Sequence, residues 1–296
     1  MNPAWVPAIT REAHRLGMTV TGHIPAFTNA DAMIAAGYDE VTHVNQLMLG
    51  WVLDPKEDTR TPLRLTAMKR PATLDLASPR VQHTIELMAA RHIAHDPTAV
   101  TLELLMGGRD GQPNPAVADY IDHLPIGLQR RRRQAIAPIA GPADAAAYDG
   151  AMVKVKQVLK LLHDRGIRLL PGTDDQTGLS VHRELQIYAE AGIPIPDVLR
   201  LATLGPERYL GRDQQLGTIA RGKLADFVLL PGDPTRDLRE LHRIAMVVKD
   251  GTLYFPSEIY PAFGVKPFAP APRLIPPPPA SKATGSGPAH DAMDEF

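Results

Sequence analysis

The chain has 296 residues, of which 44% are hydrophobic and 22% charged, with a formal net charge of −1. This composition is typical of a globular protein, and no apolar run of about 18 residues predicts a membrane span. The balanced charge excludes an electrostatic basis for binding nucleic acid or an anionic membrane, so we expect a small neutral substrate. The first residues lack the pattern of a signal peptide, and we expect a cytoplasmic location. Because cysteine is absent, any metal ion would be held by histidine or carboxylate ligands.

The first part of the chain alternates between helical and extended patterns. Residues 3–17 carry apolar side chains at helical spacing and end at a glycine, and residues 18–24 are rich in β-branched side chains. A short helix is predicted over 30–36 and a second strand over 38–44. Strand, helix and strand in such quick succession predict a parallel βα repeat.

The middle of the chain departs from this rhythm. Residues 48–90 mix Pro, Arg and Thr around one helical piece at 81–90, which predicts a lid insertion. A strand is predicted over 99–105, and residues 107–145 are irregular. The arginine run 130–133 is interpreted as a solvated helix face, with a phosphate site as the alternative.

The last part contains a long helix, a strand, three short helices and a small β module. The periodicity predicts a helix over 148–165 and a strand over 167–174, followed by helices near 182–191, 196–202 and 206–210. Short strands are expected at 217–219, 226–230 and 244–255, the last with an Asp-Gly hairpin turn. We divide the chain into residues 1–210, a β module at 211–265 and a Pro-rich disordered tail at 266–296.

Three polar residues lie at the C-terminal ends of predicted parallel strands: His23, His43 and Asp174. The carboxyl ends of the strands are where (β/α)8 enzymes place catalytic groups. Two imidazoles and a carboxylate are suitable ligands for Zn²⁺. The alternative is structural, because a histidine at a strand end is commonly hydrogen-bonded and Asp174 can form an Asx turn.

The sequence around these residues resembles the metal-dependent amidohydrolase superfamily, in its imidazolonepropionase-like and prolidase-like branch. The resemblance covers about residues 3–265 and rests on Thr-Gly-His-Ile-Pro at 21–25, Val-Thr-His at 41–43 and Pro-Gly-Thr-Asp at 171–174. Further motifs continue it, namely His182–Leu185, Leu201–Thr203, Gly222–Leu229 and Val248–Gly251. The three strand-end motifs correspond to the fifth, sixth and eighth strands of the family's barrel.

The resemblance implies an α/β fold, a partial (β/α)8 TIM-barrel-like domain with a small β-sandwich remnant. It also implies that His23 and His43 ligate a divalent metal ion. Asp174 would be a ligand and would accept a proton from the attacking water. We therefore expect a metal-dependent hydrolase of amide (C–N) or ester bonds, with Asp174 and His43 as catalytic residues.

The sequence departs from the family pattern before His23. It contains no His-x-His motif there, and no lysine precedes Lys56, so strands one to four are expected to be missing. A single ion, zinc by preference, is expected rather than two. The alternative is a truncated or split amidohydrolase that is inactive or needs an N-terminal half or self-association, with promiscuous esterase or phosphoesterase activity.

Several further residues are weaker candidates. His182 and Trp51 are predicted to contact substrate, and Leu53 and Met68 are candidates for apolar lid walls, with core packing as the alternative. Other histidines that could supplement the metal ligands are His83, His92 and His95. A serine esterase based on Ser180 is disfavoured because the Gly-x-Ser-x-Gly elbow is absent. A binding module without turnover is a further alternative, although no recognition motif supports it.

Overall fold

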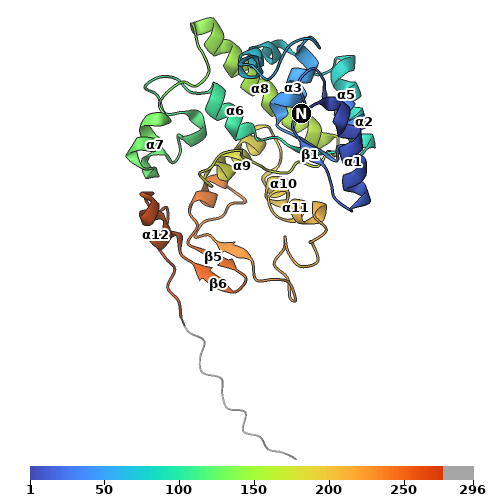
Figure 1. The fold of residues 1–296 in the computed structure, drawn as a ribbon. Helices are drawn as coiled ribbons and strands as arrows, with labels where there is room; N and C mark the ends of the chain where they lie inside the picture. Colours follow the sequence, from blue (N-terminus) through green and yellow to red (C-terminus); the bar gives the residue numbers. More distant parts are fainter. Residues whose placement is uncertain (276–296) are drawn as a thin grey trace, which may run out of the picture.

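The structure is a computed structural model, and it describes residues 1–275. Helices predominate and two small sheets accompany them (Figure 1). The helices are Val6–Arg15 (α1), Ala30–Ala35 (α2), Val44–Val52 (α3), Leu63–Thr66 (α4), Pro79–Ala90 (α5), Ala99–Met106 (α6), Ile126–Arg131 (α7), Pro142–Asp164 (α8), Ser180–Glu190 (α9), Ile195–Leu201 (α10), Leu204–Tyr209 (α11) and Pro256–Ile259 (α12). Short 3₁₀ helices are Pro3–Trp5 (η1), Ala67–Thr73 (η2), Pro115–Val117 (η3), Ile121–His123 (η4), Leu238–His242 (η5) and Tyr260–Phe263 (η6).

The first sheet is parallel and contains the strands Thr21–Gly22 (β1), Glu40–Thr42 (β2) and Ala94–Asp96 (β3), in the order β1-β2-β3. A parallel bridge from His95 to Leu169 adds a fourth extended segment beside β3. The C-terminal ends of these segments therefore meet at one edge, which confirms the predicted parallel βα arrangement. The next residues along the chain at that edge supply the candidate site.

The core lies between this sheet and the helices around it. On β2, Val41 is fully buried, and α8 contributes Tyr148, Val155 and Leu159, which are also fully buried. The helices begin and end where local chemistry dictates. The Asn29 side chain accepts a hydrogen bond from Ala32 N (3.0 Å) to start α2, for example. Burial of the apolar helix faces is the main source of stability for such a fold.

The second sheet forms a separate antiparallel layer from Phe227–Leu229 (β4), Met246–Lys249 (β5) and Thr252–Tyr254 (β6). The turn between β5 and β6 contains Asp250 and Gly251 at positive φ (49° and 74°), as a two-residue type I′ hairpin requires. The predicted hairpin is therefore confirmed. Within residues 1–275 this layer has only three strands, so the expected β-sandwich remnant is a single sheet.

The structure corrects several element predictions. Residues 99–105 form the helix α6 rather than a strand. Thr101 and Glu103 alternate with apolar residues, which imitates a strand period, but the segment packs as a helix against α8, α9 and η3. Only Leu169 of the predicted strand 167–174 is bridged. Residues 217–219 form no strand, and Ile219 is 86% exposed. The predicted lid at 48–90 is mostly helical, with α3, α4, η2 and α5 in it.

The segment from residue 266 packs against the rest of the chain at its start. Lys266 N donates to the His123 carbonyl (2.8 Å), and the Phe268 ring stacks on the His123 ring with 3.9 Å between centroids. The predicted tail boundary at 266 therefore falls within a packed segment, while residues 276–296 of that tail lie outside the described residues. Over residues 1–275, no helix combines the length and the apolar character needed to cross a bilayer.

Candidate metal and hydrolase site

The structure brings His23 and His43 together at the C-terminal edge of the parallel sheet. Their Nε2 atoms are 2.8 Å apart, and the ring centroids lie 4.7 Å apart at an interplanar angle of 57°. Burial, together with the neighbouring His23 imidazole, lowers the pKa of His43 to about 4. Burial also lowers the pKa of His23, with the Arg64 guanidinium adding to the effect. Both rings are therefore neutral at pH 7 and can offer a nitrogen lone pair.

Backbone and side-chain contacts fix the position of His43. Its amide donates to the Asp96 carbonyl (2.6 Å), which joins the end of β2 to the end of β3. Its Nδ1 lies 2.5 Å from Oγ1 of the buried Thr98. The His43 backbone has φ 65° and ψ 118°, a sparsely populated conformation for a residue with a side chain. These two hydrogen-bonding contacts thus hold the His43 imidazole in place although the backbone conformation of the residue is unfavourable.

Asp174 lies near the other ring nitrogen of His43, Nε2, and is much more exposed than the histidine. Its Oδ2 is 3.9 Å from His43 Nε2, and its side chain is 64% exposed. The loop that carries it is anchored to α6 by a hydrogen bond from the Thr101 hydroxyl to the Thr173 carbonyl. Asp174 therefore faces the histidine pair from the solvent side, beyond direct hydrogen-bond distance.

The donor atoms fit a divalent metal ion in chemistry and in part in geometry. Two neutral imidazole nitrogens converge, and a carboxylate oxygen lies nearby, which is a donor set that Zn²⁺ accepts. Among the residues that the structure describes, no three His, Cys, Asp or Glu side chains are grouped closely enough to hold a metal ion. His23 and His43 are therefore a preformed pair, and Asp174 would have to approach to complete a third ligand.

A cavity of about 960 Å³ opens beside His23. It is lined by residues from the loop after β1, the end of α3 and the lid, including Phe27, Leu53, Arg60, Arg64 and Arg80. The volume lies within the range of small-molecule sites. His23 thus lies in the wall of a cavity large enough for a small substrate, and His43 contacts His23 from behind.

The arginines of this cavity differ in how their charges are compensated. Arg60 forms two hydrogen bonds to Asp58 (2.8 and 2.7 Å) and lies over the Phe27 ring at 5.1 Å. Arg80 donates to the Trp51 carbonyl (3.1 Å). Arg64 has no acidic partner within the described part of the chain, and its charge lowers the pKa of both histidines of the pair. The cavity therefore contains an arginine without a carboxylate partner whose charge acts directly on the histidine pair.

Of the other candidates, only Leu53 borders this cavity. Trp51 is 6% exposed and donates to Thr84 Oγ1 (3.1 Å), and Met68 is fully buried, so neither lines the cavity, whereas Leu53 does. Ser180 is fully buried, which is unsuitable for a nucleophile.

The three histidines that could have supplemented the metal ligands do not border the cavity beside His23 either. Nδ1 of the fully buried His95 faces the Val41 carbonyl (2.8 Å), and His83 lies 3.9 Å from Asp31 on the surface. His92, at φ 55°, is exposed. None of the three lines the cavity beside His23.

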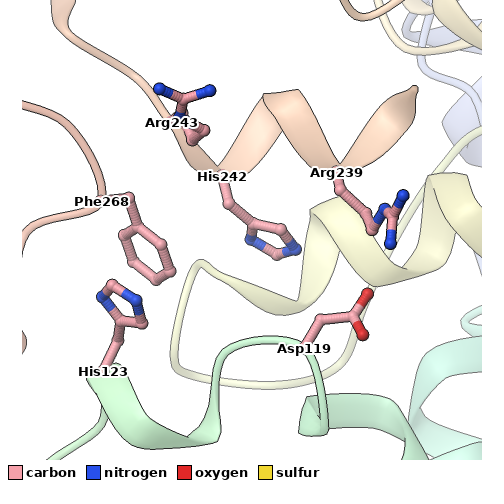
Figure 2. A pocket seen from close by; sticks show the side chains of 6 residues that line it. All are labelled: Asp119, His123, Arg239, His242, Arg243 and Phe268. Atoms are coloured by element: carbon pink, nitrogen blue, oxygen red, sulfur yellow. The ribbon is translucent and has the colours of Figure 1, made fainter. Parts of the chain in front are cut away.

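His182 belongs to a different group of side chains. Its Nδ1 is 3.0 Å from Nδ1 of His242, and both residues are buried. His242 in turn borders a second cavity of about 300 Å³, where Figure 2 shows its ring beside the stacked rings of His123 and Phe268. This contact joins α9 to η5, so the structure places His182 at the junction with the C-terminal part rather than in the cavity beside His23.

The sequence prediction missed three residues at the site: Asp96, Thr98 and Arg64. Asp96 is the last residue of β3, and His43 is the first residue after the neighbouring strand β2. Burial, with the nearby Glu40 carboxylate, raises the pKa of Asp96 to about 7. A signal for Asp96 was present, since it precedes a proline after a short β-type run. The strand predicted over 99–105 hid it, because that assignment moved the expected strand end past Thr98.

The chain belongs to the amidohydrolase family, whose model matches residues 2–254. This confirms the resemblance of the strand-end motifs. No protein in the curated set matches the chain.

Solved structures of several hydrolases share the fold. They include a Xaa-Pro dipeptidase with bound methionine (TM-score 0.56, 19% identity, 86% of this chain and 49% of that one). Bottromycin amidohydrolase is also similar, with a TM-score of 0.57 and 22% identity over 88% of this chain and 56% of that one. The A. niger ochratoxinase has a TM-score of 0.55 and 18% identity over 86% of this chain and 46% of that one. The chain spans about half the length of these structures. At such identities they are evidence for the fold alone.

Proposed function

We propose that this chain carries part of the active site of a metal-dependent hydrolase that cleaves amide (C–N) bonds of a small substrate. The observation that supports this most directly is the pair of neutral imidazoles, His23 and His43, whose Nε2 atoms face each other beside a substrate-sized cavity. Family membership supports the same reaction class. The parallel segments β1, β2, β3 and the bridged Leu169 would be an arc of a (β/α)8 barrel.

His23 and His43 would hold one divalent ion, zinc by preference, through their Nε2 atoms, with Asp174 as the carboxylate ligand. Such an ion supplies Lewis acidity and lowers the pKa of bound water to about 7. Asp174 would accept a proton from the attacking water and pass it to the leaving amine; its solvent-facing carboxylate, 3.9 Å from His43 Nε2, supports this role. Burial keeps His43 neutral, so the imidazole remains a ligand and does not compete as an acid.

The substrate is proposed to carry a negatively charged group, in contrast to the neutral substrate expected from net charge. Arg64 lines the cavity beside His23 and has no acidic partner in residues 1–275. A guanidinium binds a carboxylate or phosphate through two parallel hydrogen bonds. The local charge at the cavity is more informative about the ligand than the charge of the whole chain.

The test is a hydrolysis assay of the whole chain with a panel of small amides and activated esters, with and without Zn²⁺, Mn²⁺ or Co²⁺. We expect amide hydrolysis that a chelator abolishes and added metal restores. Asp174→Asn should lower kcat by about 10²-fold or more. Asparagine tolerates the positive φ of 47° at this position, so the fold should be kept.

Asp164→Asn is a matched control, because Asp164 is an exposed aspartate paired with Lys160 on α8. It should retain full activity. Amide hydrolysis that persists through both chelation and Asp174→Asn would contradict the proposal. Ester hydrolysis without amide hydrolysis would instead favour the promiscuous-esterase alternative. Light scattering with size exclusion would show whether the active species is one chain or an assembly.

A further inference from the structure

The hydroxyl of Thr98 defines which nitrogen of His43 carries the proton. Thr98 Oγ1 donates to the Pro97 carbonyl (2.8 Å), so its hydrogen is already used. With that hydrogen on the Pro97 carbonyl, Oγ1 is left as an acceptor, and the 2.5 Å contact with His43 Nδ1 is satisfied by a ring that donates from Nδ1–H. A neutral ring protonated on Nδ1 has its lone pair on Nε2, the atom that faces His23.

Thr98 is held in an unfavourable conformation to make this contact. It has φ 46° and ψ 43°, in the left-handed region, where a β-branched residue is a rare outlier. Such a strained residue persists only where its surroundings over-determine its conformation. Here the surroundings do so, because the adjacent Pro97 carbonyl also accepts a hydrogen bond from Val44 N (2.9 Å), which ties this loop to the start of α3.

The Thr98 side chain does not cap the helix that it precedes. It occupies the N-cap of α6, where a threonine hydroxyl commonly accepts a hydrogen bond from the first helical turn. In this helix the Thr98 side chain makes no capping hydrogen bond. The hydroxyl of a buried residue, 3% exposed, is directed to the imidazole instead. Backbone strain and a lost cap at one residue point to a role outside helix stability.

We propose that Thr98 is a positioning residue that fixes the Nδ1–H tautomer and the ring orientation of His43, so that Nε2 presents its lone pair to the metal position. This inference rests on the proposed function for its purpose, but the tautomer itself is a property of the chain without metal. With His43 Nε2 as acceptor, His23 donates its Nε2–H across the 2.8 Å contact in the metal-free chain. Loss of the Thr98 hydroxyl frees the ring to carry its proton on either nitrogen.

The first test is ¹⁵N NMR of the histidine side chains in the whole, metal-free chain at pH 7, with the His43 signals assigned by their loss in His43→Gln. We expect His43 to be protonated on Nδ1 in the wild type and in Thr98→Ser, and to populate the Nε2–H form in Thr98→Val. A wild-type His43 protonated on Nε2, or a Thr98→Val spectrum that is unchanged, would overturn the inference. This result does not depend on whether the chain hydrolyses anything.

The second test is Zn²⁺ affinity, measured by competition with a chromophoric chelator. Outer-shell partners of a metal-binding histidine typically contribute 10- to 100-fold in affinity, so Thr98→Val should weaken binding by that factor and Thr98→Ser should restore it. If Thr98→Val fails to fold, Thr98→Gly replaces it, because glycine accepts the positive φ while lacking the hydroxyl. Equal loss in Thr98→Ser and the hydroxyl-free variants would assign Thr98 a packing role and refute the proposal. Absence of Zn²⁺ binding in the wild type, with the Nδ1–H tautomer intact, would instead refute the proposed function alone.

Discussion

The His23 and His43 rings meet through their Nε2 atoms at 2.8 Å, so that a single proton lies between the buried His43 imidazole and the exposed His23 imidazole. Two cationic rings at this distance would repel strongly, and the site is partly shielded from water. The pair therefore resists protonation in the folded state. That resistance links the stability of the chain to pH.

Stability should fall as the pH drops below about 6.5. The pKa of His43 is about 4 in the folded chain and near 6.5 when unfolded, so between these values the unfolded state binds the extra proton. Stability is thus fully present above 6.5 and decreases toward pH 4. His43 should account for about 2 kcal/mol of the loss between pH 7 and pH 4.5. The pKa values of His95, His182 and His242 are also lowered by burial, so the whole chain should lose more.

Urea unfolding of wild type and His43→Gln at pH 7 and pH 4.5 isolates this contribution. The variant should lose less stability between the two pH values than the wild type does. Equal losses in the two proteins would show that His43 is not buried in its neutral form.

Arg64→Gln should weaken the binding of anionic substrates. Removing a hydrogen bond to a charged group costs about 1.5–3 kcal/mol, which corresponds to roughly a 10- to 100-fold rise in KM. A neutral analogue of the same size should be affected little. Arg60→Gln is the matched control, since Arg60 lines the same cavity but is already paired with Asp58. Similar effects of Arg64→Gln on the charged and the neutral substrate would rule out a specific role in anion binding.

Gly172→Ala should destabilise the chain by about 1–3 kcal/mol, as expected for overpacking. A Cβ at Gly172 would lie 2.4 Å from both carboxylate oxygens of Asp96, so that carboxyl must move. Asp96→Ala in the same chain should recover part of the loss, which a double-mutant cycle of thermal or urea unfolding measures. Gly127→Ala is the control, because a Cβ there meets nothing within 4 Å and α7 favours alanine. A fully additive cycle would exclude the contact as the cause.

His242→Ala should destabilise the fold without affecting metal binding. The side chain is 5% exposed, and its loss would leave the buried His182 Nδ1 without its partner, at a cost of about 1–3 kcal/mol. Zn²⁺ affinity should be unchanged, because His242 lies at the second cavity and not beside His23. His83→Ala, at an exposed histidine, should alter neither quantity. A fall in Zn²⁺ affinity with His242→Ala would place His182 and His242 in the metal site after all.

The sequence predicted the parts of the fold that depend on local patterns. The α8 periodicity, the Asp250-Gly251 hairpin and the βα alternation up to His43 are each specified by nearby residues. Residues 99–105 were misassigned because a helix buried on several sides has no polar stripe to reveal its period.

The approach of His23 to His43 followed from counting one βα unit between parallel strands, which is a topological argument. The roles of Thr98 and Arg64 could not be obtained that way. They depend on the contact between the loop after β3 and the end of β2, and on where the lid helix α4 packs. Such contacts join residues far apart in the sequence and leave no periodic signal.

His43, Thr98 and Asp174 all have positive φ values, 65°, 46° and 47°, although none of them is a glycine. Glycine at any of the three would relax the backbone, and strained residues of this kind are typical of functional sites. Selection for thermal stability alone would therefore favour their replacement. If a library of variants of this chain were selected for stability alone, glycine should replace these three residues. Selection for activity should retain them, and the difference would measure how much of their retention depends on the chemistry rather than on the fold.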